Sequence, residues 1–148
     1  MKFKTTILII SVILGLNSPC AQKAADESVE TKAIKQVLVD AYIKGIHVDR
    51  DIKLVKAGFH PDFAMHVLND NQIIKASLDM WLQRLQLNGI KNENKIDYEF
   101  KFIDVTNNSA IVKMEIYENS KHLYTDYFCL YKFDSGWKSV SKIFAAYE

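Results

Sequence analysis

Cysteine, arginine and unbalanced charge are scarce in this chain, and each shortage removes a class of protein. Two cysteines among 148 residues cannot build a disulfide-stapled scaffold. Lysine and arginine total 19 against 18 acidic residues, and a net charge of +1 gives no electrostatic footprint for a nucleic-acid backbone. Only two arginines, Arg50 and Arg84, are present, which disfavours bidentate recognition of phosphate. We therefore expect no nucleic-acid partner.

The sequence motifs of well-known catalytic and cofactor sites are missing as well. No glycine-rich phosphate loop, no G-x-S-x-G nucleophile elbow and no H-E-x-x-H zinc motif occurs. Because no pair of histidines has metal-ligand spacing and no paired cysteines remain, we expect no metal site. We also expect no cofactor. A chain of 148 residues is most simply a single domain.

The first 21 residues have the layout of a secretory signal peptide. Lys2 and Lys4 precede an apolar run at Ile7–Leu16, and small or turn-forming residues follow before Cys20. This run is too short for a bilayer span, which needs about 20 apolar residues. We expect an exported protein, periplasmic or extracellular, with a lipoprotein anchored at Cys20 as the alternative. Cleavage would leave Cys129 as a lone thiol, more simply a small buried residue than a nucleophile.

The rest of the chain is predicted to hold three helices and six strands. Apolar residues at helical spacing mark the helices, and alternating residues between turn-forming groups mark the strands. Asp49 and Ser77 are the expected N-caps of the short second helix and of the third helix. The expected segments are a flexible leader at 22–28 and one domain at 29–148, with helices at 29–46, 49–58 and 77–87, strands at 63–68 and 73–76, and four consecutive strands from about 95 to 148.

Alternate residues of the last four strands separate into a face without full charges and a face that carries them. Since strand side chains point to opposite faces in turn, we expect one covered and one wet side. The uncharged face mixes aliphatic residues with tyrosines and serines, which need hydrogen-bond partners when buried. The sequence therefore predicts a sheet that encloses a cavity. The expected ligand-binding residues, on this face and on the helices, are Tyr42, Trp81, Tyr98, Met114, Tyr127, Ser139 and Ser141.

The order of elements, together with three short motifs, resembles the nuclear transport factor 2-like (NTF2-like) superfamily. The motifs are Phe59-His60-Pro61-Asp62, Thr125-Asp126-Tyr127 and Gly136-Trp137-Lys138. From Glu30 to the C-terminus the chain is most similar to the secreted bacterial branch labelled putative lumazine-binding proteins. The resemblance implies an α+β cone, in which a curved, mostly antiparallel sheet wraps N-terminal helices around a deep pocket, and often a homodimer. Because the superfamily includes ketosteroid isomerase, scytalone dehydratase, limonene epoxide hydrolase and members without known activity, the fold assigns no chemistry.

The catalytic pattern of the isomerase is not reproduced in this sequence. By rough alignment its base position falls near Val67 and its second acid near Cys129, and neither side chain performs that role. Two other catalytic candidates are His60, in a loop beside a proline, and Asp126. Asp126 is expected on the charged face, either in a cross-strand ion pair with Lys142 or as a catalytic acid.

The leading interpretation is an exported domain that binds a small apolar or aromatic molecule, without established catalysis. One alternative is an isomerase or dehydratase that uses His60 or Asp126. Another is a protein-interaction domain that acts through the outer face of the sheet, although apolar residues there fit a homodimer interface better. The apolar residues expected on the outer face are Ile103, Ile111, Tyr117, Tyr124, Phe128, Leu130, Val140 and Phe144.

Overall fold

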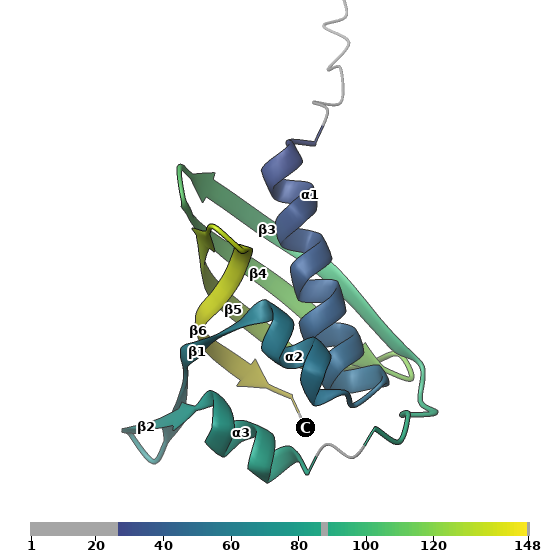
Figure 1. Cartoon of the computed structure of the whole chain (residues 1–148). Helices are drawn as coiled ribbons and strands as arrows, with labels where there is room; N and C mark the ends of the chain where they lie inside the picture. The colour runs from purple at the N-terminus through teal and green to yellow at the C-terminus, as the bar shows by residue number, and fades with distance from the viewer. Residues whose placement is uncertain (1–26, 87–88, 148) are drawn as a thin grey trace, which may run out of the picture.

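A curved six-stranded sheet with helices across one face forms this α+β protein (Figure 1). The computed structural model describes residues 27–86 and 89–147. The predicted signal peptide, the Cys20 anchor and residues 22–26 of the leader lie outside these ranges. Within them, no helix is long and apolar enough to cross a membrane. The elements are α1 (Val29–Leu38), η1 (Val39–Val48), α2 (Ile52–Gly58), β1 (Phe59–Asn69), β2 (Gln72–Ser77), α3 (Leu78–Leu85), β3 (Ile96–Thr106), β4 (Ser109–Glu118), β5 (Lys121–Phe133) and β6 (Gly136–Ala146).

The sheet is mixed, with β6 near its centre. The strand order is β2-β1-β6-β5-β4-β3, in which β1 runs parallel to β6 and every other neighbouring pair is antiparallel. Positive φ angles at Asp70 and Asn71, and again at Asn119 and Ser120, form the tight turns after β1 and β4. Asn and Asp tolerate this conformation better than most residues. The predicted α+β class and the predicted turns are confirmed.

The first helix begins where the sequence predicted and then changes its hydrogen bonding. Ser28 is the N-cap, because its hydroxyl accepts a hydrogen bond from the N–H of Thr31 at 3.1 Å. From Val39 to Val48 the backbone is π-helical, with i→i+5 hydrogen bonds, which the sequence did not predict. Glu30 accepts a hydrogen bond from Nε1 of Trp137 at 2.7 Å, which fixes α1 to β6.

The two short helices begin at side-chain caps and pack closely on their neighbours. Asp51 caps α2, so the predicted cap at Asp49 was two residues early. Gly58 ends α2 against η1, where a Cβ would lie only 2.3 Å from the Cβ of Ala41. A close approach, rather than an unusual φ angle, therefore requires glycine there. Ser77 caps α3 as predicted.

On β4 the face that was predicted to be covered is the buried face. On most of β5 the prediction was wrong, because the other face is buried. The residues of β5 buried against the helices are Asp126, Phe128 and Leu130. Tyr127, Cys129 and Tyr131 lie on the outer face, and Tyr127 is 43% exposed. Tyrosine has an apolar body and a polar tip and tolerates partial exposure. A lack of full charges therefore did not identify the buried face of this strand.

An extra residue in β6 explains why the predicted inner face of that strand was partly wrong. Adjacent residues of β5 pair with Ser139 and Ser141, which leaves Val140 between them unpaired. A β-bulge of this kind moves the side chains that follow to the opposite face. Ser139 is therefore buried as predicted, whereas Ser141 faces outward and Lys142 is buried. A second bulge, in β3, likewise leaves Phe102 53% exposed on the outer face.

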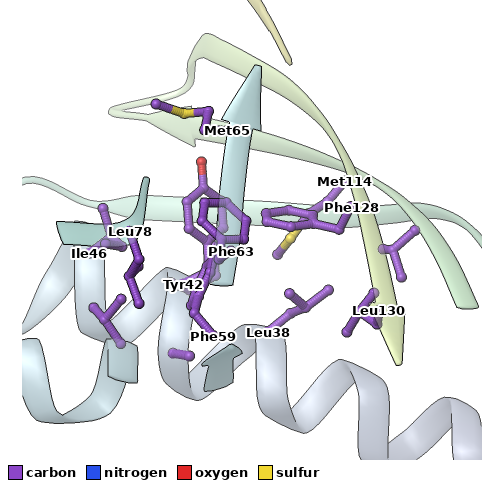
Figure 2. Packing of buried hydrophobic residues seen from close by; sticks show 14 of the residues in the cluster. Leu38, Tyr42, Ile46, Phe59, Phe63, Met65, Leu78, Met114, Phe128 and Leu130 are labelled. Carbon is purple, nitrogen blue, oxygen red and sulfur yellow. The ribbon is translucent and has the colours of Figure 1, made fainter. Parts of the chain in front are cut away.

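The core lies between the α1–η1 helix and the inner face of the sheet (Figure 2). Tyr42 of η1 contacts Phe128 of β5, with ring centres 5.0 Å apart, in an edge-to-face arrangement. Phe128 and Leu130, which were predicted for the outer face, belong to this core instead. The outer face exposes a different apolar set. Its large exposed members are Phe102, Ile111, Tyr127, Tyr131 and Ile143.

Candidate functional site

A cavity of about 370 Å³ lies at one end of the core, between η1, α3, β1 and β6. Its apolar wall includes Trp81 of α3, Met65 of β1 and Phe144 of β6. Trp81 is held in place by stacking on Phe63, with ring centres 5.8 Å apart. Arg84, one turn further along α3, also lines the cavity and is solvent-exposed. The cavity is thus aromatic inside and basic at its exposed side.

Tyr42 and Lys142 line the inner wall of this cavity, and both contact the buried side chain of Asp126 behind them. Oδ1 of Asp126 accepts a hydrogen bond from Nζ of Lys142 at 2.5 Å, and Oδ2 accepts one from the Tyr42 hydroxyl at 2.8 Å. Lys142 also donates to the Tyr42 oxygen at 3.3 Å, which closes a triangle. Asp126 is 0% exposed and Lys142 is 4% exposed. This triangle links η1, β5 and β6.

Burial acts on the two proton donors of the triangle in opposite directions. Burial, followed by the negative charge of Asp126, raises the pKa of Tyr42 well above its ordinary value. Tyr42 therefore stays protonated and donates to the carboxylate. Burial lowers the pKa of Lys142, and the charge and hydrogen bond of Asp126 oppose that effect. The proton on Lys142 is thus held chiefly by one carboxylate.

Aromatic rings surround the amine of Lys142. Nζ lies 4.6 Å from the ring centre of Phe144, 5.0 Å from that of Tyr42 and 5.3 Å from that of Trp81. Phe128 adds a fourth ring at 5.8 Å. Ring faces attract a cation and keep water from it. Lys142 nevertheless lines the cavity, so its amine lies beside open volume.

His47 contributes a polar atom without a partner to the same cavity. Its Nε2 is buried and makes no hydrogen bond within the described part of the chain. Burial, followed by the positive charge of Lys142, lowers the pKa of His47 to about 4. The ring is therefore neutral at pH 7. Buried polar atoms are normally satisfied, so this nitrogen is a candidate contact for a ligand.

The π-helical segment explains how His47 reaches the site. In an α-helix a residue five positions later lies about 140° around the axis, on another face. The i→i+5 pattern of η1 brings His47 back above Tyr42, with ring centres 4.8 Å apart. Helical periodicity alone pointed to Tyr42 and missed His47. The bulge at Val140 similarly hid Lys142, because strict alternation put Ser141 on the inner face.

The structure divides the predicted ligand-binding residues into three groups. Tyr42 and Trp81 line the cavity. Met114 and Ser139 are fully buried in the core, and Tyr98 is 41% exposed beside Phe100. Tyr127 and Ser141 lie on the outer face of the sheet, away from the cavity.

The two catalytic candidates lie in different places. The predicted ion pair between Asp126 and Lys142 is present, but it is buried on the inner face rather than exposed on the outer one. His60 does not line the cavity; it stacks on Phe133, and its Nδ1 accepts a hydrogen bond from the N–H of Asp62 at 3.1 Å. Across residues 27–86 and 89–147, no cluster of acidic, histidine or cysteine side chains is placed to hold a metal ion.

Loss of Lys142 is expected to destabilise the fold far more than loss of an exposed lysine with a similar ion pair. Lys142→Met leaves the buried carboxylate of Asp126 without its cation, which costs about 3–5 kcal/mol in urea unfolding. Lys44→Met removes an exposed pair with Asp40 at 2.6 Å, and because water screens that pair the expected loss of stability is much smaller. The double variant Lys142→Met/Asp126→Asn should recover part of the loss. Equal losses for Lys142→Met and Lys44→Met would contradict this account.

Stability is expected to fall as the pH drops, because folded His47 resists protonation. The pKa of His47 decreases from 6.5 to about 4 on folding. As the pH falls between these two values, the unfolded chain binds the proton and the folded chain does not, so the free energy of unfolding decreases. Between pH 7 and pH 4.5 the free energy of unfolding should change by about 2 kcal/mol less in His47→Gln than in the wild type. His66→Gln, on β1, is the matched control, and a smaller change is expected only for His47→Gln. Identical pH profiles for the two variants would count against a buried neutral His47.

Comparisons with known proteins bear on the fold and the family. The aldolase FrzH of Cladobotryum sp is 33% identical over 96 residues, which cover 64% of this chain and 75% of that protein. An NTF2-like protein of unknown function from Shewanella baltica superposes with a TM-score of 0.65 at 20% identity, over 80% of this chain and 94% of that one. Another from Methylobacillus flagellatus gives 0.64 at 20% identity, over 83% and 97%. These structures confirm the predicted NTF2-like fold.

One family profile spans almost all of the described chain. It carries the description "Putative lumazine-binding" and matches residues 29–145. The matched range runs from the first residue of α1 almost to the end of β6, and it includes every residue of the triangle and His47. The resemblance inferred from the sequence is thereby confirmed, and this chain belongs to the Putative lumazine-binding family, with an NTF2-like fold.

Proposed function

We propose that this protein binds a small, mainly apolar or aromatic molecule in the cavity between η1, α3, β1 and β6. One observation carries the proposal: the aromatic wall of the cavity presents the Lys142 amine, the Tyr42 hydroxyl and the unpartnered Nε2 of His47. Small-molecule sites usually combine a concave apolar surface of about 300–1,000 Å³ with a few convergent polar groups. The family description, which names lumazine, supports the same class of ligand.

The residues of the cavity suggest the shape of the ligand. A flat ring would pack against Trp81, and a carbonyl or ring nitrogen would meet Lys142 and His47 at the inner end. Lumazine, a flat bicyclic heteroaromatic with carbonyl and N–H groups, has both features. No ion pair of Arg84 is present within the described residues, so an acidic group at the exposed end of the ligand would be favoured there.

A second candidate function is catalysis on a carbonyl compound. The relative named as an aldolase supports it, and so do the acid, hydroxyl and amine that meet in the Tyr42–Asp126–Lys142 triangle. The isomerase or dehydratase alternative retains Asp126 as its acid. His60 no longer supports this alternative, because it lies away from the cavity.

Lumazine and 2-naphthol, titrated separately by isothermal calorimetry, are expected to bind the wild-type protein with one site per chain. Val67→Trp, which places an indole in the cavity, should weaken binding at least about tenfold. Tyr127→Ala, on the outer face, is the control and should leave the affinity unchanged. The proposal fails if neither probe binds, or if Tyr127→Ala weakens binding as much as Val67→Trp.

We further propose that the outer face of the sheet joins two copies of the chain. The support is the apolar side chains exposed there, among them Phe102, Ile111 and Ile143, because a large exposed apolar patch usually has a partner. Ile143→Lys is therefore expected to shift the protein from dimer to monomer in sedimentation velocity. Met80→Lys, at a residue that is 56% exposed on helix α3 rather than on the sheet, should not. A wild-type protein that sediments as a monomer would refute the proposed dimer.

A further inference from the structure

We propose that the amine of Lys142 captures an aldehyde or a ketone as a reversible covalent imine at the inner wall of the cavity. The inference rests on the proposed function, because the carbonyl compound has to occupy the same cavity. It adds a covalent step for the carbonyl compound and assigns the nucleophile to one atom, Nζ of Lys142.

The position of Lys142 separates it from the other lysines. Within the described ranges it is the only lysine that is buried, and its amine lies beside open volume rather than bulk water. A hydrated surface lysine is mostly an ammonium ion at neutral pH and therefore attacks carbonyl carbon only slowly. Removal of water disfavours the charged form and makes the free amine easier to reach. Lys142 therefore combines access for a ligand with shielding from solvent.

Asp126 provides a place for the proton that Lys142 must lose. The 2.5 Å hydrogen bond between Nζ and Oδ1 is a direct path for proton transfer. The transfer converts two buried charges into two neutral groups, which four surrounding aromatic rings accommodate at lower cost. The Tyr42 hydroxyl remains on Oδ2 and keeps the carboxyl group oriented.

The covalent step balances without any oxidant, reductant or cofactor. Once Lys142 has passed a proton to Asp126, the nitrogen lone pair attacks the carbonyl carbon and a C–N bond forms. The surplus proton passes from nitrogen to the former carbonyl oxygen by way of Asp126 and the Tyr42 hydroxyl, which lines the cavity, and this gives a neutral carbinolamine. A second proton follows the same route from Asp126 through Tyr42 and lets that oxygen leave as water, and an iminium ion remains beside the restored carboxylate. In sum, one ammonium ion and one carbonyl compound become one iminium ion and one water.

A purely structural ion pair explains less of what is observed. A structural ion pair needs no cavity beside its amine. Replacing both partners of a buried ion pair by apolar residues often leaves the stability of a protein unchanged or increases it. It also leaves unexplained the buried Nε2 of His47, which lines the same cavity without a partner. A carbonyl compound held at Lys142 would bring its own polar groups to that nitrogen.

Reductive trapping on the full-length wild-type protein tests the inference. The protein is incubated at pH 7 with 2-naphthaldehyde and sodium cyanoborohydride, which reduces an iminium ion to a stable secondary amine. Peptide mapping by mass spectrometry then locates the adduct. We expect Lys142 to be labelled at least about tenfold faster than exposed Lys121. An excess of 2-naphthol, which has the same ring system but no carbonyl group, should slow labelling of Lys142 and not of Lys121.

Two outcomes would overturn the inference, and they differ in what they say about the proposed function. In the first, the protein binds 2-naphthol in calorimetry and is labelled at exposed lysines but not at Lys142. That result would overturn imine formation and leave the ligand-binding proposal intact. If neither lumazine nor 2-naphthol binds and Lys142 is not labelled, the inference and the proposed function are overturned together. Lys121→Met should keep the Lys142 adduct, whereas Lys142→Met/Asp126→Asn, which removes both charges, should lose it.

Discussion

The buried ion pair between Asp126 and Lys142 is the interaction on which the architecture of the site depends. Each charge is tolerated away from water only because the other lies 2.5 Å away, and the Tyr42 hydroxyl satisfies the second carboxylate oxygen. The pair requires β5 and β6 to present opposite charges to the same inner face at neighbouring positions. It also requires η1 to carry Tyr42 across that face. Sheet register, helix position and cavity wall are thus set by one polar contact.

The same pair shows where sequence reasoning succeeded and where it stopped. Helix caps, turns and the order of elements could be predicted because each depends on a few neighbouring residues, as at Ser77 and Asp70-Asn71. The faces of β5 and β6 depend on register across strands, and the bulge at Val140 changes that register without an obvious mark in the sequence. The prediction paired Asp126 with Lys142 correctly but placed both in water, because charges are usually solvated.

A signal for the correct orientation was present in the sequence. Asp126 and Lys142 each stand two residues before a phenylalanine, Phe128 and Phe144, so alternation puts each charge on the same face as a large apolar ring. Two opposite charges in that arrangement on adjacent strands favour a buried pair over two solvated ones. His47 carried no comparable signal. Its place at the cavity follows from the π-helical hydrogen bonding of η1, which helical periodicity does not anticipate.

The parallel pairing of β1 with β6 has a consequence for how this protein is made. β6 is the last of the six described strands along the chain, yet it is inserted between β1 and β5. Until it arrives, the β1–β2 hairpin has no neighbour that joins it to the three-stranded meander β3-β4-β5, and both parts present unpaired edges. The sheet therefore closes only after β6 has been synthesised. Because Lys142 is on that final strand, the polar centre of the cavity is assembled in the same late event.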